Sequence, residues 1–314
     1  MRPPGRAKIY GSILETICDT PLVRINRMAE GLEAEVLAKL EFFNPFASVK
    51  DRIAVAMLDR LEANAALVPD VVIVEPTAGN TGISLAAACA ARGLRCILVM
   101  PEGFSTEREK MMRFLGAELI LTPAEQGIGG AIECAMQIVA DTEGAVMPWQ
   151  YGNPANAEIH RRTTAEEIWN DTAGRVDAVV LGVGTGGTLT GVGEVLKAKN
   201  PDIRVIAVEP ALSAILSGGE AFPHGIQGLG TGFVPEVLNT DIIDEVMTIR
   251  EVDALRTARE LALQEGIPAG ISSGAALNCA LRLAARRDMR GSRIVTLLPS
   301  PAERYITTHL FDGI

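Results

Sequence analysis

The stretch AVVLGVGTGGTLTGVG, residues 178–193, decides the fold class. Its first five residues, Ala178–Gly182, form an apolar run typical of a buried strand, and a glycine-rich turn then leads into a helical pattern. A buried strand that continues through a short turn into a helix is typical of parallel sheets with crossover helices. The stretch therefore predicts an α/β fold.

The same alternation of apolar runs and amphipathic helical patterns extends outward over almost the whole chain. A first group of strands, which we expect to begin one open sheet, is predicted at Val36–Leu40, Val71–Val74, Cys96–Met100 and Glu118–Leu121. Their helices are predicted at Ile53–Leu61, Gly82–Ala91, Glu107–Leu115 and Ala131–Ala140. A second group of strands is predicted at Ala178–Gly182, Val205–Val208, Val246–Ile249 and Ile294–Leu298. We therefore expect two lobes, each with an open, mostly parallel twisted sheet flanked by helices.

A polar segment that contains prolines, Pro148–Arg162, interrupts the alternation between the two groups. Such changes in composition are typical of turns and linkers. We take this segment as the candidate boundary between the lobes.

Length, composition and charge exclude several classes of protein. The chain has 314 residues, of which 48% are hydrophobic and 22% charged, as in an ordinary globular enzyme of two modest domains. The 39 acidic residues outnumber the 29 Lys and Arg residues, and the net charge of −10 argues against a nucleic-acid partner. No apolar run resembles a signal peptide or is long enough to cross a bilayer, so we expect no membrane association and a cytoplasmic location.

Neither the cysteines nor the histidines form the pattern of a disulfide framework or a metal site. The five cysteines are scattered through apolar segments without a CxxC pair, so we expect buried, reduced thiols. The three histidines, His160, His224 and His309, lack metal-ligand spacing, so we expect no metal and no histidine-based triad. We interpret His160, like Cys279 and Trp169, as a structural residue of a packed helix.

The glycine-rich turn within residues 183–193 has the features of an anion site. Its backbone amides lie at a helix N-terminus, where the helix dipole places roughly half a positive charge. The turn contains no Lys or Arg, so glycine amides and the hydroxyls of Thr185 and Thr188 would hold the anion, which suits a small, permanently bound phosphate. The turn also fits the GxGxxG motif of dinucleotide-binding folds, with Glu209 about 20 residues later. By itself it does not distinguish the two ligands.

A second glycine-rich turn, EPTAGNT at residues 75–81, also lies between an expected strand and an expected helix start. A dinucleotide needs only one anion site, whereas two suit a ligand with a phosphate at one end and a carboxylate at the other. Thr77, Asn80 and Thr81 offer hydroxyl, amide and backbone donors to a carboxylate. The alternative is that both glycine turns merely close strand–helix joints.

A third stretch, NPFASVKDR at residues 44–52, places Lys50 where a turn leads into a helix. Desolvation and the positive end of the helix dipole both lower the pKa of an amine, and the neutral amine is the form that condenses with an aldehyde. The ordinary interpretation is a solvated lysine beside Asp51 and Arg52. The other two stretches favour a reactive lysine.

Seven segments together resemble the fold-type II pyridoxal phosphate enzymes and, among them, the cysteine synthases, or O-acetylserine sulfhydrylases. The resemblance covers nearly the whole chain, and seven segments in the family's order are far more specific than any one of them. In order along the chain they are NPFASVKDR, EPTAGNTGI, QYGNPAN, VGTGGTLTG, IQGLGTGF, GISSGAA and LPSPAERY.

The resemblance implies pyridoxal 5′-phosphate as the cofactor. By this resemblance Lys50 would form the internal Schiff base, Ser300 would hydrogen-bond the pyridine nitrogen, and Asn80 would meet the ring hydroxyl. The cofactor phosphate would be bound by Gly184, Thr185, Gly186, Gly187 and Thr188. Gly228 would line the closing cleft. The substrate carboxylate would be bound by Thr77, Ala78, Gly79, Asn80, Thr81 and Gln150.

The implied reaction is a β-replacement that forms L-cysteine and acetate from O-acetyl-L-serine and sulfide through an aminoacrylate, with Lys50 as the base for the α-proton. Ser300 fits this reaction, because a neutral hydroxyl cannot hold the ring nitrogen protonated and so favours loss of a β leaving group over transamination. The alternative is an enzyme that uses O-phosphoserine or serine, similar to cystathionine β-synthase. A phosphate leaving group needs a cation, and no Lys or Arg lies between Arg204 and Arg250.

Two other classes of protein are rivals to this interpretation. A nicotinamide-dependent dehydrogenase would leave Lys50 and the Asn80 turn without a role. A catalytically weak binding protein is the other rival. Two departures from the family pattern are Ala78, where serine is usual and whose missing hydroxyl predicts weaker substrate binding, and Pro301-Ala302 in place of Ser-Gly.

The resemblance also implies domains and partners. We expect residues 44–152 to form a smaller, mobile domain that binds the substrate carboxylate, and residues 1–43 with 153–314 to form a larger domain that binds the cofactor phosphate. A homodimer is implied, and the C-terminal tail of serine acetyltransferase is a candidate partner. This chain's own end, Phe311–Ile314, is similar to such a tail, although an ordinary frayed terminus explains it more simply. The true sulfur donor stays open.

Overall fold

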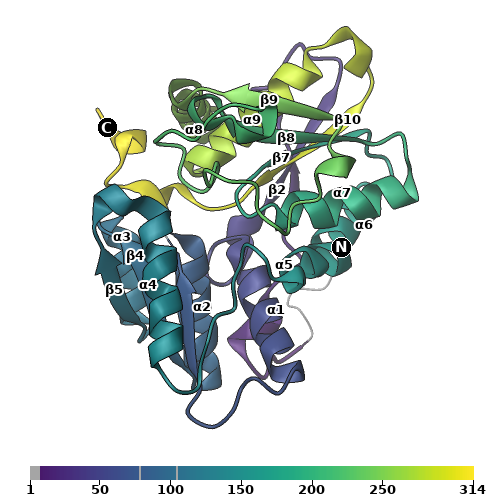
Figure 1. Ribbon diagram of the computed structural model, residues 1–314. Coiled ribbons are helices and arrows are strands. Elements are labelled where there is room, and N and C mark those ends of the chain that lie inside the picture. The colour runs from purple at the N-terminus through teal and green to yellow at the C-terminus, as the bar shows by residue number, and fades with distance from the viewer. Residues whose placement is uncertain (1–7, 78, 104) are drawn as a thin grey trace.

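The computed structural model describes residues 8–77, 79–103 and 105–314. Two separate sheets, each with helices on its faces, build two lobes of the molecule (Figure 1). The predicted α/β fold with two open, mostly parallel sheets is confirmed.

The larger sheet has six strands in the order β1-β2-β10-β7-β8-β9. Neighbouring strands are parallel except β1, which pairs antiparallel with β2 at the edge. Central strands such as β7 are buried on both faces, which explains their continuous apolar sequences. The strands are β1 (Leu22–Arg24), β2 (Glu35–Leu40), β7 (Ala178–Gly182), β8 (Arg204–Pro210), β9 (Glu245–Ile249) and β10 (Arg293–Leu298).

The smaller sheet has four parallel strands in the order β5-β4-β3-β6. All of them come from one contiguous part of the chain. They are β3 (Val72–Pro76), β4 (Arg95–Pro101), β5 (Glu118–Thr122) and β6 (Ala145–Val146).

Helices cover both faces of each sheet. On the smaller sheet, α1 (Lys50–Ala63), α2 (Asn80–Arg92) and α3 (Thr106–Phe114) share one apolar core, and α4 (Gly127–Asp141) packs on the opposite face. On the larger sheet, α8 (Glu251–Glu265) and α9 (Ile271–Ala284) cover one face, while α6 (Ala165–Asp171) and α7 (Gly187–Lys199) cover the other (Figure 1). The short helix α5 (Pro154–Ile159) joins the core of the smaller lobe through Ala155.

Three details differ from the sequence expectations. The strand at 36–40 does not belong to the sheet of the first group, because β2 pairs with β10 in a parallel register that sets Val36 opposite Ile294. Order along the chain does not determine that pairing. The edge strands β1 and β6 were not predicted, since three and two residues are too few for a periodic pattern. The segment 148–162 is not irregular throughout, because Asn153 caps α5 and Pro154 occupies its first turn.

A buried ion-pair network attaches the start of α1 to the larger lobe. Arg52 donates from Nε to Glu41 Oε2 at 2.7 Å and from Nη1 to Glu167 Oε1 at 2.6 Å, and Lys39 Nζ lies 2.8 Å from Glu167 Oε2. Burial alone would raise the pKa of Glu167, but its bonds to Arg52 and Lys39 lower it to about 2. The charges are therefore paired, and the helix that begins at Lys50 has a fixed position.

All five cysteines are free thiols. Cys89, Cys96 and Cys279 are buried as expected. The expectation of burial is wrong for Cys18 and Cys134, which are half-buried, because Cys18 lies in a loop and Cys134 on a partly exposed face of α4. Among residues 8–77, 79–103 and 105–314, no helix has the length and apolar character needed to span a membrane.

Candidate active site

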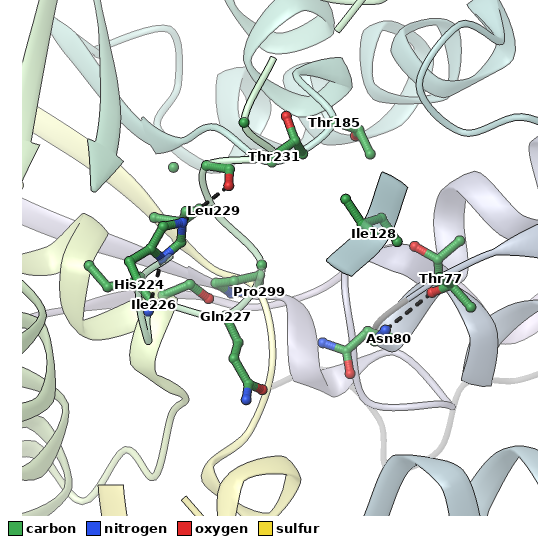
Figure 2. A pocket seen from close by; sticks show the side chains of 18 of the residues that line it. Thr77, Asn80, Ile128, Thr185, His224, Ile226, Gln227, Leu229, Thr231 and Pro299 are labelled. Atoms are coloured by element: carbon green, nitrogen blue, oxygen red, sulfur yellow. Dashed lines mark hydrogen bonds between the residues drawn. The ribbon is translucent and has the colours of Figure 1, made fainter. Parts of the chain in front are cut away.

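A cavity of about 720 Å³ lies between elements of the two lobes. In Figure 2, Thr77 and Asn80 of the smaller lobe lie on one side, and His224, Ile226 and Gln227 of the larger lobe lie on the other. The cavity brings together most residues predicted from sequence. Those that line it are Lys50, Thr77, Gly79, Asn80, Thr81, Gln150, Gly184, Thr185, Gly186, Thr188, Gly228 and Ser300.

Two predicted residues are not in this set. Gly187 is buried at the start of α7 behind the lining. Ala78 lies outside the described residues.

Lys50 is the first residue of α1 and lines the cavity. Burial lowers the pKa of its amine from 10.5 to about 8. At this pKa about one tenth of the amine is neutral at pH 7, against well under one hundredth for an ordinary lysine. The geometry thus argues against a solvated surface lysine and favours a nucleophilic amine.

The glycine positions of the turn after β7 have no room for side chains. A Cβ on Gly184 would lie 2.4 Å from the carbonyl oxygen of Gly228, and one on Gly187 would lie 1.9 Å from Asn156 Oδ1. Gly186, which precedes α7, has a φ of 86°, a left-handed conformation that favours glycine. Because side chains are excluded, the backbone amides at this helix N-terminus can approach an anion closely.

Both threonines of this turn are oriented by buried polar partners. Asn156 Nδ2 donates to Thr185 Oγ1 at 3.0 Å, and Thr188 Oγ1 lies 3.1 Å from His160 Nε2. Burial, and then the charges of Arg52 and Lys50, hold the pKa of His160 well below its usual value, so the imidazole is neutral. Interpreting His160 as a helix-packing residue was incomplete, because the fold places its ring against a hydroxyl that lines the cavity.

The second turn, after β3, is held by hydrogen bonds of its own. Thr77 Oγ1 accepts a hydrogen bond from the backbone amide of Gly79 at 3.2 Å, and Thr81 Oγ1 donates to Gln150 Oε1 at 2.7 Å. Asn80 begins α2, and its buried Oδ1 has no hydrogen-bond partner among the described residues. A buried amide oxygen without a partner at a cavity wall indicates a place for a ligand.

Glu75, near the end of β3, holds the neighbouring segment that carries Gln150. Its carboxylate accepts from the backbone amides of Trp149 at 2.8 Å and Gln150 at 2.9 Å. Trp149 has a φ of 61°, which is strained for a bulky residue, so the two hydrogen bonds hold a turn that aims Gln150 into the cavity. Burial raises the pKa of Glu75 to about 7. Sequence reasoning missed this residue, although it opens the EPTAGNT segment.

Ser300, Tyr305 and Arg108 form a contact chain in the cavity wall. Ser300 Oγ lies 3.0 Å from the hydroxyl of Tyr305, and the guanidinium carbon of Arg108 lies 4.8 Å from the centre of the Tyr305 ring. Sequence reasoning missed Tyr305 and Arg108, and no local pattern distinguishes them. Arg108 also corrects an argument from sequence, because the lack of cations between residues 204 and 250 does not leave the cavity without one.

The feature that suggested a dinucleotide has another explanation. The buried carboxylate of Glu209 accepts from the amides of Leu216 at 2.8 Å and Ser217 at 3.0 Å and from the Ser217 hydroxyl at 2.6 Å. Glu209 therefore fixes a neighbouring loop. Among the described residues, no group of three or more His, Cys, Asp or Glu side chains could hold a metal ion.

The cavity residues fit pyridoxal phosphate. A partly neutral lysine suits an aldehyde, and a turn of close-packed glycines with two hydroxyls suits a phosphate. The unpaired amide oxygen of Asn80 and the buried hydroxyl of Ser300 line the same cavity and offer polar partners to a ring. Each feature comes from a different element. Together they match the different ends of one small cofactor.

Comparisons with known proteins agree with this fit. The family model described as pyridoxal-phosphate dependent enzyme matches residues 13–300. A cysteine synthase of Staphylococcus aureus is 46% identical over 306 residues, which cover 97% of this chain and 98% of the relative. A solved cysteine synthase of Entamoeba histolytica has a TM-score of 0.94 at 43% identity and covers 99% of this chain and 93% of its own. A solved O-ureido-L-serine synthase has a TM-score of 0.94 at 46% identity, and the match covers 98% of this chain and 96% of that structure's chain. The resemblance inferred from sequence is confirmed, and the chain belongs to the family of pyridoxal-phosphate dependent enzymes.

Proposed function

We propose that the protein is a cysteine synthase, which forms L-cysteine and acetate from O-acetyl-L-serine and sulfide. The observation that carries the proposal is the meeting of Lys50, the 184–188 turn and the 77–81 turn in one cavity. The extent of similarity to cysteine synthases supports the choice of substrates. Pyridoxal phosphate, when bound, supplies an electron sink for the negative charge that forms when the substrate α-proton is removed.

Lys50 is the proposed attachment point of the cofactor and the proposed base. Its pKa of about 8 keeps part of the amine unprotonated at neutral pH, so it can accept the α-proton once the substrate amine has displaced it. A base of this pKa can also release the proton again within the same site.

The two glycine-rich turns supply most of the other proposed contacts with the cofactor and the substrate. Residues 184–188 bind the cofactor phosphate through backbone amides and the hydroxyls of Thr185 and Thr188. Asn80 contacts the ring hydroxyl, and Ser300 contacts the ring nitrogen. The substrate carboxylate is bound by Thr77, Ala78, Gly79, Asn80, Thr81 and Gln150, with Gly228 lining the opposite wall.

The proposed domains are residues 44–152 and residues 1–43 with 153–314. The two turns then belong to different domains. Binding of a substrate carboxylate to the 77–81 turn would draw the smaller domain toward the larger one and exclude water from the reacting atoms. Small-angle scattering with and without a carboxylate analogue tests this motion, and an unchanged profile would remove it from the mechanism.

Absorption spectroscopy tests the function directly. Purified protein is expected to show a visible band from bound pyridoxal phosphate, and O-acetylserine is expected to change that band. Lys50→Ala is expected to lose the band of the lysine-bound cofactor, whereas Lys110→Ala, at an exposed position on α3, is expected to keep it. A protein that neither contains nor takes up pyridoxal phosphate would refute the proposal.

O-phosphoserine is a second candidate substrate because Arg108 lines the cavity and a guanidinium binds phosphate well. The ratio of kcat/KM for the two esters decides between them. A higher value with O-phosphoserine would reverse the proposed choice. The same assay with thiosulfate in place of sulfide identifies the sulfur donor.

We further propose a cytoplasmic homodimer. Its mass in solution is measurable by sedimentation. The C-terminal tail of a serine acetyltransferase is a proposed ligand of the cavity, and a synthetic tail peptide should compete with substrate. Deletion of residues 311–314 tests whether this chain's own end competes as well, and unchanged substrate affinity would exclude self-inhibition.

A further inference from the structure

Ser300 and Tyr305 share one buried hydrogen bond at the cavity wall. Ser300 comes two residues after the end of β10, next to Pro299, which Figure 2 labels. Tyr305 is the last residue of the short 3-10 helix η9 (Ala302–Tyr305). Their oxygens lie 3.0 Å apart, the side chains are 0% and 1% exposed, and both line the cavity. Within the part of the chain that the structure describes, neither hydroxyl has another hydrogen-bond partner.

The Tyr305 ring cannot turn away from Ser300. A Cβ on Gly270 would lie only 2.2 Å from Cε2 of this ring, so the ring packs directly on the backbone of Gly270. The amide of Gly270 in turn donates to the carbonyl of Ser300 at 2.9 Å. The same backbone thus fixes both partners, and the bond between their hydroxyls has one geometry.

Three features bear on which hydroxyl donates. A phenol is a stronger donor than an aliphatic alcohol, because its oxygen gives up the proton more readily. The Tyr305 proton has no acceptor other than Ser300 among the described residues, and a buried proton without an acceptor is costly. The cation of Arg108, 4.8 Å from the ring centre, withdraws electron density from the phenol and strengthens its donor. The phenol acidity and the nearby cation thus favour Tyr305 as the donor.

We propose that Tyr305 is a positioning residue, which donates to Ser300 and so directs the Ser300 proton into the cavity toward the ring nitrogen of the bound cofactor. A nitrogen that accepts this hydrogen bond carries no proton. The cofactor ring is then a weaker electron sink, which favours expulsion of a β leaving group over transamination. The inference rests on the proposed function and adds the residue that enforces its reaction type.

Arg108 gives this arrangement a connection to the substrate turn. It lies on α3 of the smaller lobe, and its Nη1 would lie 3.4 Å from a Cβ on Gly79. The helix η9, which carries Tyr305, leaves the larger lobe and contacts α3. In Figure 1 this C-terminal part of the chain, drawn in yellow, lies beside α3. One arginine therefore touches both the region of the proposed carboxylate site and the ring that orients Ser300.

Nitrogen NMR of the resting protein tests the proposal without turnover. The protein is loaded with pyridoxal phosphate labelled with ¹⁵N in the ring, and the ¹⁵N shift reports whether the ring nitrogen is protonated. The wild type and Tyr10→Phe, a tyrosine outside the cavity lining, are expected to show an unprotonated nitrogen. Tyr305→Phe is expected to shift toward the protonated value and to raise the ratio of transamination to cysteine formation about tenfold, the effect of one lost hydrogen bond to a polar group.

A double-mutant cycle separates positioning from general damage. If Tyr305 acts through Ser300, Tyr305→Phe has no further effect on the shift or the product ratio in a Ser300→Ala background. Additive effects would contradict the proposal. Arg108→Gln keeps both hydroxyls and is expected to produce a smaller change in the same direction, which tests the idea even where Tyr305→Phe fails to fold.

The outcomes distinguish this inference from the proposed function. A protein that makes no cysteine from O-acetylserine and sulfide refutes the function. A protein that makes cysteine but has a protonated ring nitrogen in the wild type, or the same ¹⁵N shift in wild type, Tyr305→Phe and Arg108→Gln, overturns the inference alone.

Discussion

Two turns of the same construction differ in how tightly they are built. Each follows a parallel strand and opens a helix, the 184–188 turn between β7 and α7 and the 77–81 turn between β3 and α2. In the first, Cβ atoms on Gly184 and Gly187 would collide with backbone or a fixed amide at 2.4 and 1.9 Å. In the second, a Cβ on Gly79 would meet only the tip of an arginine at 3.4 Å.

The support behind the two turns differs as well. Neutral groups, Asn156 and His160, orient the threonines of the 184–188 turn. A buried carboxyl group, that of Glu75, holds the strained turn beside the 77–81 turn. The difference teaches that the turn proposed for the retained cofactor is packed against the backbone, whereas the turn proposed for the exchanging substrate leaves room at Gly79. Four experiments test this distinction.

The largest effect is expected from adding one methyl group to each turn. Gly184→Ala forces its Cβ against the carbonyl of Gly228, and overpacking of this kind costs about 3 kcal/mol, so the affinity for pyridoxal phosphate should fall about 100-fold. Gly79→Ala should leave that affinity within about threefold, since a side-chain tip can move. Fluorescence titration of the apo proteins measures both. Equal losses would erase the distinction between the turns.

A smaller effect is expected from neutralising the carboxylate behind the 77–81 turn. The assay is run at about pH 8.5, where a carboxyl group with a pKa of about 7 is ionised. Glu75→Gln replaces one acceptor oxygen with a donor that faces a backbone amide, and the loss of a charged hydrogen bond corresponds to roughly a tenfold change. We expect KM for O-acetylserine to rise by that factor while cofactor affinity stays constant. Glu133→Gln, an exposed position on α4, is the matched control. A loss of cofactor affinity in Glu75→Gln would mean that Glu75 supports both turns.

The pH dependence of cofactor uptake tests the lysine between the two turns. Only neutral Lys50 reacts with the aldehyde, and burial lowers its pKa to about 8. The rate of uptake by the apo protein should therefore rise about tenfold from pH 7 to pH 9 and then level off. Stopped-flow absorption measures the rate. A rate that still rises steeply above pH 10 would show that Lys50 titrates like an exposed lysine.

The smallest effect is expected at Ala78, which lies outside the described residues. The resemblance predicts that a serine hydroxyl here contributes to carboxylate binding, so Ala78→Ser should lower KM for O-acetylserine about threefold, less than a full hydrogen bond because water replaces part of it. Steady-state kinetics measure the change. No gain in apparent affinity would remove the missing hydroxyl as an explanation.

Sequence predicted those parts of the molecule that are encoded locally. The strands and helices of each lobe have the periodicity of their secondary structure, and the turns at 77–81 and 184–188 have glycines and hydroxyls at adjacent positions, so both could be found by inspection. The pairing of β2 with β10 could not be found this way, because about 250 residues separate them and every buried strand has the same apolar pattern.

The same reason explains which site residues were missed. Tyr305 and Arg108 belong to different segments, and neither has a sequence neighbour that indicates a cavity. Their contact exists only because the chain after β10 crosses to α3. Glu75 was visible within a motif, but its role depends on the left-handed backbone at Trp149, which local sequence does not reveal.

The central position of β10 also sets an order for synthesis on the ribosome. The smaller sheet can form once residues 72–146 have emerged, because all its strands lie in that stretch. The larger sheet cannot close before residues 293–298 emerge, since β10 separates β2 from β7 and pairs with both. Until then two apolar strands expose unpaired edges, and the nascent chain is at its most prone to aggregate. Ser300 lies two residues beyond β10, so its proposed contact with the cofactor ring becomes possible only after this last strand has emerged.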